Sequence, residues 1–233
     1  MGSTFSHLKG AAMSFNESTA RSRTRDHLVG LGLPYACFCG LGLISRFVPA
    51  LFIVFVLFGI AFPLLWAKRT HNWSGIGFSK RNLGQAFIWG IAAGIGWGLY
   101  TFVMFGKNQP LPPKWGLQVA LAIPIWLLVL SPFREFFFRG WFQPRLQAAI
   151  GKWRGLLTTA LAFTLWHYFP KFEGTSTASL PLSSLAGIVS TFGLGLLMGF
   201  IHQRTRNIVA PWLAHAIGGI ALVMVGGMSF VQS

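Results

Sequence analysis

Residues 116–140 of the chain read GLQVALAIPIWLLVLSPFREFFFRG. The run is uncharged up to Pro132 and, with the residues around it, approaches the roughly 20 apolar positions that cross a bilayer core as a helix. Arg134, Glu135 and Arg139 then enter the same run among four phenylalanines. A charge inside a membrane helix costs about 2.5–3.5 kcal/mol on insertion scales, so charges kept there indicate a functional site. This stretch therefore predicts a membrane-spanning fold and points to where its chemistry lies.

The whole chain has the composition of a membrane protein. Of its 233 residues, 53% are hydrophobic and only 10% are charged, whereas soluble domains are about a quarter charged. Lysine and arginine number 19 against four acids, Glu17, Asp26, Glu135 and Glu173. This basic surplus lies in short loops between apolar segments, which is typical of membrane topology rather than of nucleic-acid binding. The expected partner is the lipid bilayer, and no nucleic-acid partner is expected.

About seven apolar segments are predicted to cross the membrane as helices, giving an all-α, polytopic transmembrane helical bundle. The fourth is expected to run on to a turn at Gly151, because nothing polar enough to stop a helix precedes it. Gly90 with Gly94, and Gly195 with Gly199, have the spacing that lets helices approach closely. The expected limits are 28–45, 49–67, 84–106, 116–138, 154–169, 183–202 and 208–230.

The loops alternate in basic content, and this predicts an orientation. Lysines and arginines precede the first expected span, follow the second, and lie between the fourth and fifth and between the sixth and seventh. The opposite side keeps only Arg46, Lys107, Lys114 and Lys171. By the positive-inside rule the N-terminus is cytoplasmic and the C-terminus is outside. We expect an integral, multi-pass protein of a bacterial cytoplasmic membrane.

Polar residues inside the expected spans can converge. Glu135 and Arg139 are four residues apart, so they share a helix face and can form an ion pair. Glu135 lies sixteen positions before Gly151 and His167 sixteen after it. A hairpin turning at that glycine sets both roughly 24 Å from the turn at 1.5 Å per residue. With His215 from the last span, they predict one site. The alternative is a set of isolated polar residues at helix ends.

Three motifs then resemble a known family. REFFFRG, FTLWH and GLLMGFIHQRTRNIVAPWLAHAIGG are similar to the signatures of the CPBP (Abi) intramembrane proteases, which are related to the Ras-converting CAAX endopeptidase. The family patterns are Glu-Glu-x-x-x-Arg, Phe-x-x-x-His and His-x-x-x-Asn, and the resemblance spans about residues 70–230. It implies an endopeptidase that hydrolyses a bond near the terminus of a membrane-associated, hydrophobic or lipidated protein or peptide.

The matches are carried over one residue at a time. Glu135 and Arg139 match the second Glu and the Arg of the first signature. Phe163 and His167 match the second signature, and His215 matches the third. The resemblance therefore predicts Glu135, His167, His215 and Arg139 as catalytic residues and Phe163 as a substrate-binding residue.

Two positions depart from the family pattern. Arg134 stands where the family has its first Glu, and Gly219 stands where it often has Asn. In the family, the first Glu and the second-signature histidine are thought to activate water, and the last histidine and Asn to stabilise the oxyanion. Glu135 is the only acid in any expected span, so either it is the base or His167 acts without a carboxylate. Arg134 is predicted to bind substrate, as an oxyanion donor or through a C-terminal carboxylate.

Other functions are weighed beside this one. Glu135 could be locked to Arg139, and the protein would then be a catalytically inactive relative that binds tails or acts as a scaffold. A transporter would ordinarily show broken helices in a repeated half, and no such repeat is seen. Two histidines and a carboxylate could ligate zinc, but there is no His-Glu-x-x-His pair. We expect no metal and no cofactor.

The chain is expected to divide into three parts. Residues 1–26 are a polar cytoplasmic segment expected to be disordered. Residues 27–82 hold two transmembrane helices and a basic loop, and 83–233 form a protease-like transmembrane core that carries the three motifs. The oligomeric state is open.

Overall fold

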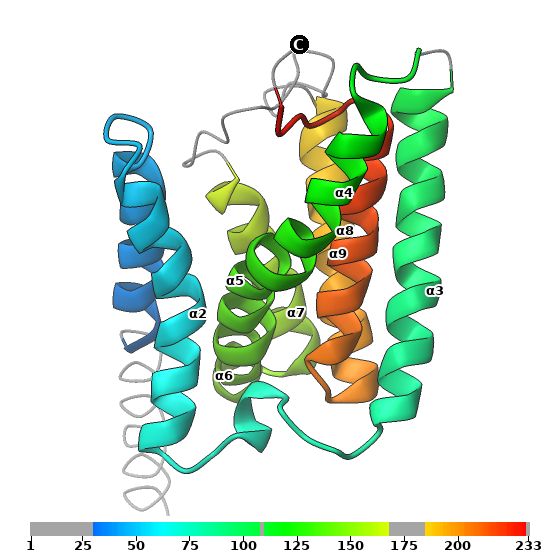
Figure 1. The fold of residues 1–233 in the computed structure, drawn as a ribbon. Coiled ribbons are helices and arrows are strands. Elements are labelled where there is room, and N and C mark those ends of the chain that lie inside the picture. Colours follow the sequence, from blue (N-terminus) through cyan, green and yellow to red (C-terminus); the bar gives the residue numbers. More distant parts are fainter. Residues whose placement is uncertain (1–29, 108–109, 168–184, 232–233) are drawn as a thin grey trace, which may run out of the picture.

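The computed structural model describes residues 30–107, 110–167 and 185–231, and within these ranges it contains helices and turns but no strand (Figure 1). The predicted all-α bundle is confirmed. The expected segment 1–26 lies outside the described residues. The helices are Gly30–Ile44, α2 (Leu51–Arg69), α3 (Leu83–Thr101), α4 (Trp115–Ile125), α5 (Ser131–Glu135), α6 (Gln143–Ile150), α7 (Lys152–Trp166), α8 (Leu185–Thr205) and α9 (Val209–Met224).

Each of the seven predicted spans overlaps one of these helices or helix runs. Four runs of the described chain are long and apolar enough to cross a membrane: Leu51–Arg69, Leu83–Met104, Trp115–Ile150 and Leu185–Thr205. The fourth predicted span does continue to the turn at Gly151, which has φ +92°. The seventh is shorter than predicted, because α9 stops just before Gly226, whose φ of +76° cannot continue a right-handed helix.

The long run Trp115–Ile150 changes its winding around the charged residues. π-helical segments at Trp126–Leu130 and Phe136–Phe142 flank α5 on both sides. Pro132 contributes to the first of them, because a proline cannot donate to the carbonyl four residues earlier and its ring clashes with it. π-helical turns occur frequently at functional sites. Here they bracket the segment that carries Arg134 and Glu135.

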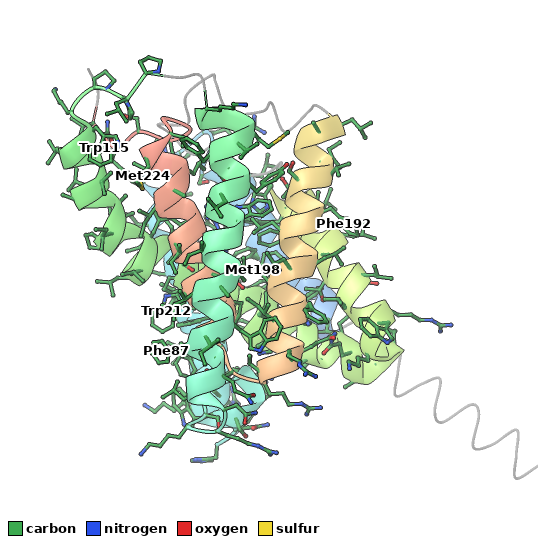
Figure 2. The ribbon with its side chains drawn as sticks, turned by 90° about the vertical axis from the view of Figure 1, so that its right-hand side faces the viewer. Phe87, Trp115, Phe192, Met198, Trp212 and Met224 are labelled. Carbon is green, nitrogen blue, oxygen red and sulfur yellow. The ribbon has the colours of Figure 1, made fainter. Side chains whose placement is uncertain are left out.

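Small residues set how closely the helices pack. A Cβ placed on Gly90 of α3 would lie 2.8 Å from the carbonyl oxygen of Ala210 on α9. A Cβ on Gly195 of α8 would lie 3.1 Å from the Cα of Ala160 on α7. The predicted role of these glycines in close helix approach is confirmed. Figure 2 shows α3 running beside α9, with Phe87 and Trp212 near the same end.

The helix Gly30–Ile44 and α2 cover one side of the bundle, and α3 forms the opposite side (Figure 1). Aromatic contacts hold the helix Gly30–Ile44 and α2 against the central helix, which is the run Trp115–Ile150. Phe38 lies parallel to Phe137 with ring centroids 4.1 Å apart, and Phe55 meets Phe133 edge-on at 5.4 Å. Such contacts stabilise the pairs by about 0.5–1.5 kcal/mol each beyond area burial. They fix the outer face of the helix that carries Glu135.

The turns at 70–82, 151 and 206–208 lie at one end of the bundle (Figure 1). Asn207 joins two of them. Its Nδ2 donates to the carbonyl oxygens of Ser79 and Arg81 at 2.7 and 3.1 Å, and its Oδ1 accepts from the Val209 N–H at 3.0 Å. Loops that were predicted to be basic and cytoplasmic therefore share one end.

A cysteine placed at Lys152 tests the orientation that we propose from these loops. Lys152 is exposed at the basic end, so in a background with Cys37 and Cys39 replaced by serine, Lys152→Cys should resist an impermeant thiol reagent in intact cells. Lys114→Cys, on the opposite side, should react under the same conditions. Rapid labelling at position 152 in intact cells, with none at position 114, would show that the protein has the opposite orientation.

Candidate active site

The carboxylate of Glu135 sits in the interior at the end of α5 and is fully buried. Its Oε1 accepts from Nδ1 of His215 at 2.5 Å and from Nη1 of Arg139 at 3.4 Å. The predicted i,i+4 ion pair between Glu135 and Arg139 is confirmed. A buried carboxylate persists only when it is paired and hydrogen-bonded, and here α9 supplies one of its two partners.

Arg139 is fixed from two further directions. Its Nη2 donates to the carbonyl oxygen of Gly195 at 3.0 Å, and that carbonyl is within reach because α8 packs closely at this glycine. Its guanidinium lies 4.2 Å from the centroid of the Phe163 ring. Phe163 is itself fully buried, so in this conformation its ring supports Arg139. A substrate contact by Phe163 stays a prediction.

The protonation of His215 follows from its two neighbours. Nη1 of Arg134 lies 3.4 Å from Nε2 of His215. Arginine can only donate, so Nε2 accepts and the imidazole proton lies on Nδ1, which faces Glu135. The four side chains of Arg134, His215, Glu135 and Arg139 thus form a continuous row. In it, a neutral imidazole bridges a cation and a carboxylate.

Arg134 is buried where the family has an acid, and aromatic rings surround it. Its guanidinium carbon lies 5.0 Å from the ring centroid of Phe133, 5.1 Å from Trp126 and 5.6 Å from Trp166. Cation–π attraction of this kind is strongest on tryptophan and grows when the pair is desolvated. The aromatic surroundings therefore let the helix carry a second buried cation beside Arg139.

His167 closes the last turn of α7. Its Nδ1 is 2.7 Å from the carbonyl oxygen of Phe163, and a carbonyl only accepts, so Nδ1 carries the proton and Nε2 presents a lone pair. The ring packs edge-on against Trp166, at 4.5 Å between centroids. Arg134 contacts the same Trp166 ring, with its guanidinium carbon 5.6 Å from the centroid. His167 is only half-buried, unlike the carboxylate.

The structure brings the predicted residues together in a particular order. Glu135, Arg139 and His215 are in direct contact, and Arg134 joins them through His215. His167 and His215 both pack against the Phe163 ring, at 4.4 and 6.0 Å between centroids, and among the described residues no hydrogen bond joins His167 to Glu135. The predicted hairpin at Gly151 is present, and Phe163 on its second helix contacts both Arg139, at 4.2 Å from the guanidinium to the ring centroid, and His167, at 4.4 Å between ring centroids.

Gly219 is a departure that the structure explains. A Cβ at this position would overlap the indole ring of Trp126. The same indole lies under the guanidinium of Arg134. One tryptophan therefore fills the space beside the missing Asn and also supports the arginine that replaces the first Glu, so the two departures are physically linked. The sequence alone gave no signal for this, because Trp126 lies outside the three motifs.

Restoring Asn at position 219 should therefore destabilise the protein. The new side chain must displace Trp126, and overpacking of this kind typically costs about 1–3 kcal/mol. We expect Gly219→Asn to lower the unfolding temperature in detergent, and Trp126→Ala in the same chain to recover part of the loss. A Gly219→Asn protein as stable as the parent would show that the indole has another place to go.

The histidines and the carboxylate of the site are residue types that can bind a metal ion. In the part of the chain that the structure describes, no three His, Cys, Asp or Glu side chains gather in an arrangement that could hold a metal ion. Cys37 and Cys39 are both free thiols. The absence of a stoichiometric zinc stays a prediction, to be checked by metal analysis of the purified protein.

An integral membrane bundle with a buried carboxylate, histidine and arginine cluster is the class of protein that the fold and site define. Residues 115–220 match the family model of type II CAAX prenyl endopeptidases, Rce1-like. The match runs from the start of α4 into α9 and supports the CAAX protease-like (CPBP) family that the motifs predicted. No curated protein and no solved structure matches the chain.

Proposed function

We propose that the protein is an intramembrane endopeptidase that hydrolyses a peptide bond near the terminus of a membrane-associated protein or peptide. The observation that carries the proposal is the row formed by Arg134, His215, Glu135 and Arg139, which shares the rings of Phe163 and Trp166 with His167. The matched family is described as type II CAAX prenyl endopeptidases. A prenylated C-terminal tail is therefore the first substrate class to test.

His167 is the proposed general base. Its Nε2 carries the lone pair, and it is half-buried while Glu135 has no exposed surface. In the proposed reaction, a water oxygen attacks the scissile carbonyl carbon while its proton passes to Nε2. The C–N bond then breaks and His167 returns that proton to the leaving amine. General-base catalysis of this kind contributes about 10²–10⁴ in rate.

Arg134 is the proposed oxyanion donor. The carbonyl oxygen of the substrate becomes negative in the tetrahedral intermediate, and a fixed cation in a water-poor site stabilises that charge strongly. The aromatic rings around Arg134 and its contact with His215 hold the guanidinium in one place. Arg134 would then replace the donor that the family pattern assigns to Asn, because Trp126 fills the space beside Gly219.

Glu135 is a positioning residue in this scheme. It holds the Nδ1–H of His215, so that Nε2 of the same ring is turned towards Arg134. The sequence left open whether Glu135 or His167 is the base, and full burial of Glu135 between Arg139 and His215 favours His167.

A catalytically inactive relative that binds tails without cutting them is the second candidate. Two observations favour it: a cation at the position of the first acid, and the Trp126 indole against Gly219. In that case Arg134 would bind the C-terminal carboxylate of a tail. Arginine is well suited to carboxylate recognition through paired hydrogen bonds.

Mass spectrometry of membrane-protein termini tests the proposal even while the substrate is unidentified. Membranes from cells that express the protein are compared with membranes from cells that lack it. We expect one protein or a few to carry a shortened terminus only when the protein is present. Identical termini in both membranes would favour the tail-binding candidate.

A further inference from the structure

A polar cavity lies at the end of the bundle that holds the basic turns. Its volume is about 510 Å³. Segment Ser74–Ile76 and the ends of α6 and α8 enclose it, together with the start of α7. His202 of α8, on its wall, lies seven residues beyond Gly195, or about 10 Å along the helix, so the cavity is separate from the row that holds Glu135. Its lining is Ser74, Gly75, Gly77, Pro144, Gln147, Ala148, Lys152, His202, Gln203 and Arg206.

The side chains that line this cavity carry positive charge only. Lys152 and Arg206 supply two cations, and no lining residue is an acid. Arg206 adopts a left-handed backbone, with φ of +50°, and its N–H donates to the His202 carbonyl oxygen at 2.7 Å. The tight turn therefore places a guanidinium directly after the helix end on which His202 lies.

His202 points to a ligand independently of the charge. Its side chain is only 7% exposed, and its Nε2 has no hydrogen-bond partner among the described residues. That nitrogen would lie 3.0 Å from a Cβ on Gly77, which also lines the cavity and has φ of +80°. Buried polar groups are nearly always hydrogen-bonded, so an orphaned ring nitrogen on a cavity wall calls for a partner.

The remaining polar groups shape the wall without neutralising it. The side-chain amides of Gln147 and Gln203 both donate to the carbonyl oxygen of Lys152 at 3.2 Å. They thereby fix the first residue of α7 at the edge of the cavity.

We infer that this cavity binds a phosphate group, with Lys152 and Arg206 supplying the positive charge and His202 a buried donor. Charge-assisted hydrogen bonds to phosphate are stronger than neutral ones. Helix α2 ends at Arg69 and α8 ends at Thr205, so the cavity lies where two candidate spans leave the apolar layer. The phosphate could belong to an anionic lipid headgroup or to free inorganic phosphate.

Lipid titration of the full-length protein tests the inference. The protein is stripped of lipid in neutral detergent, and binding of phosphatidylglycerol, phosphatidylcholine and inorganic phosphate is measured separately by native mass spectrometry and thermal shift. The test variant is Lys152→Ala/Arg206→Ala. The matched control, Arg154→Ala/Arg204→Ala, removes two exposed cations from the same two segments but leaves the lining intact.

We expect the test variant to weaken phosphatidylglycerol binding by about tenfold or more, as loss of charged hydrogen bonds would, and the control by less than about twofold. Binding of phosphatidylglycerol alone identifies a headgroup site, and competition by inorganic phosphate identifies a free-phosphate site. His202→Leu should also weaken binding. Equal losses in the test and control variants, or no preference for phosphatidylglycerol over phosphatidylcholine together with no phosphate binding, would overturn the inference.

Discussion

Replacing His167 with alanine is expected to lower the rate of peptide cleavage by about 10²–10⁴, the usual contribution of a general base. The ring is half-buried at the end of α7, and its Nδ1 donates to the carbonyl one turn earlier. Its removal should therefore leave the bundle folded. Cleavage is measured on a prenylated peptide, or on a tail found by terminal mass spectrometry, with the protein reconstituted in liposomes.

His71→Ala is the matched control, because His71 is exposed in the turn after α2 and outside the proposed site. It should cleave like the parent. Binding of an uncleavable peptide to His167→Ala should stay within about twofold of the parent, because a base that acts on water contributes little to ground-state binding. Full cleavage activity in His167→Ala would show that another group takes the proton and that the role proposed for His167 is wrong.

The second large effect is expected at Arg139, and it concerns stability. Arg139→Met removes one partner of a fully buried carboxylate, and breaking a buried pair in this way costs about 3–5 kcal/mol. It also leaves the Gly195 carbonyl without this donor. The unfolding temperature in detergent should fall sharply, and expression should fall with it.

A double substitution separates charge from packing. Glu135→Gln in the Arg139→Met chain removes the unpaired charge while keeping a hydrogen-bonding side chain against His215. The double variant should be more stable than Arg139→Met alone, because it no longer buries an unpaired charge. A gain of this kind measures the coupling energy between the two contacting residues. If Arg139→Met unfolds like the parent, the carboxylate is held by His215 alone and Arg139 does not brace it.

Much of the bundle could be predicted because membrane helices obey one strong rule. Long apolar runs satisfy their own backbone hydrogen bonds in lipid, so segments such as 49–67 and 84–106 are visible in the sequence and are helical in the structure. The i,i+4 spacing of Glu135 and Arg139 depends only on local geometry, and it gave the ion pair correctly.

The details of the candidate site could not be predicted, because they depend on contacts between segments that are distant in the sequence. Trp126 is one apolar residue in an apolar run, and only the packing of α9 against the central helix brings Gly219 onto its indole. The proton position on His215 likewise requires knowing that Arg134 lies beside Nε2. Sequence spacing placed Glu135 and His167 at one depth, but it could not show that His167 would pack against Phe163 and Trp166, the rings that also contact His215 and Arg134.

His202 could not be predicted as a site residue from the sequence, for a related reason. It lies in the third motif region but matches no position of the family pattern, and its chemistry depends on a cavity built from four separate segments. The residue pattern of α8 cannot show that Gly77 and Lys152 line the same cavity as His202.

Hydrolysis with water-derived oxygen is the most direct measurement of the central claim that this cluster cuts peptide bonds. Reconstituted parent protein and His167→Ala are each incubated with the same tail peptide in water enriched in oxygen-18. Bound peptide and product are measured by mass spectrometry in one sample. The parent should yield a shortened peptide whose new carboxyl group carries oxygen-18, while His167→Ala should hold the peptide uncut. Peptide that is bound equally by both proteins and never cut by the parent would contradict the account and identify a tail-binding protein.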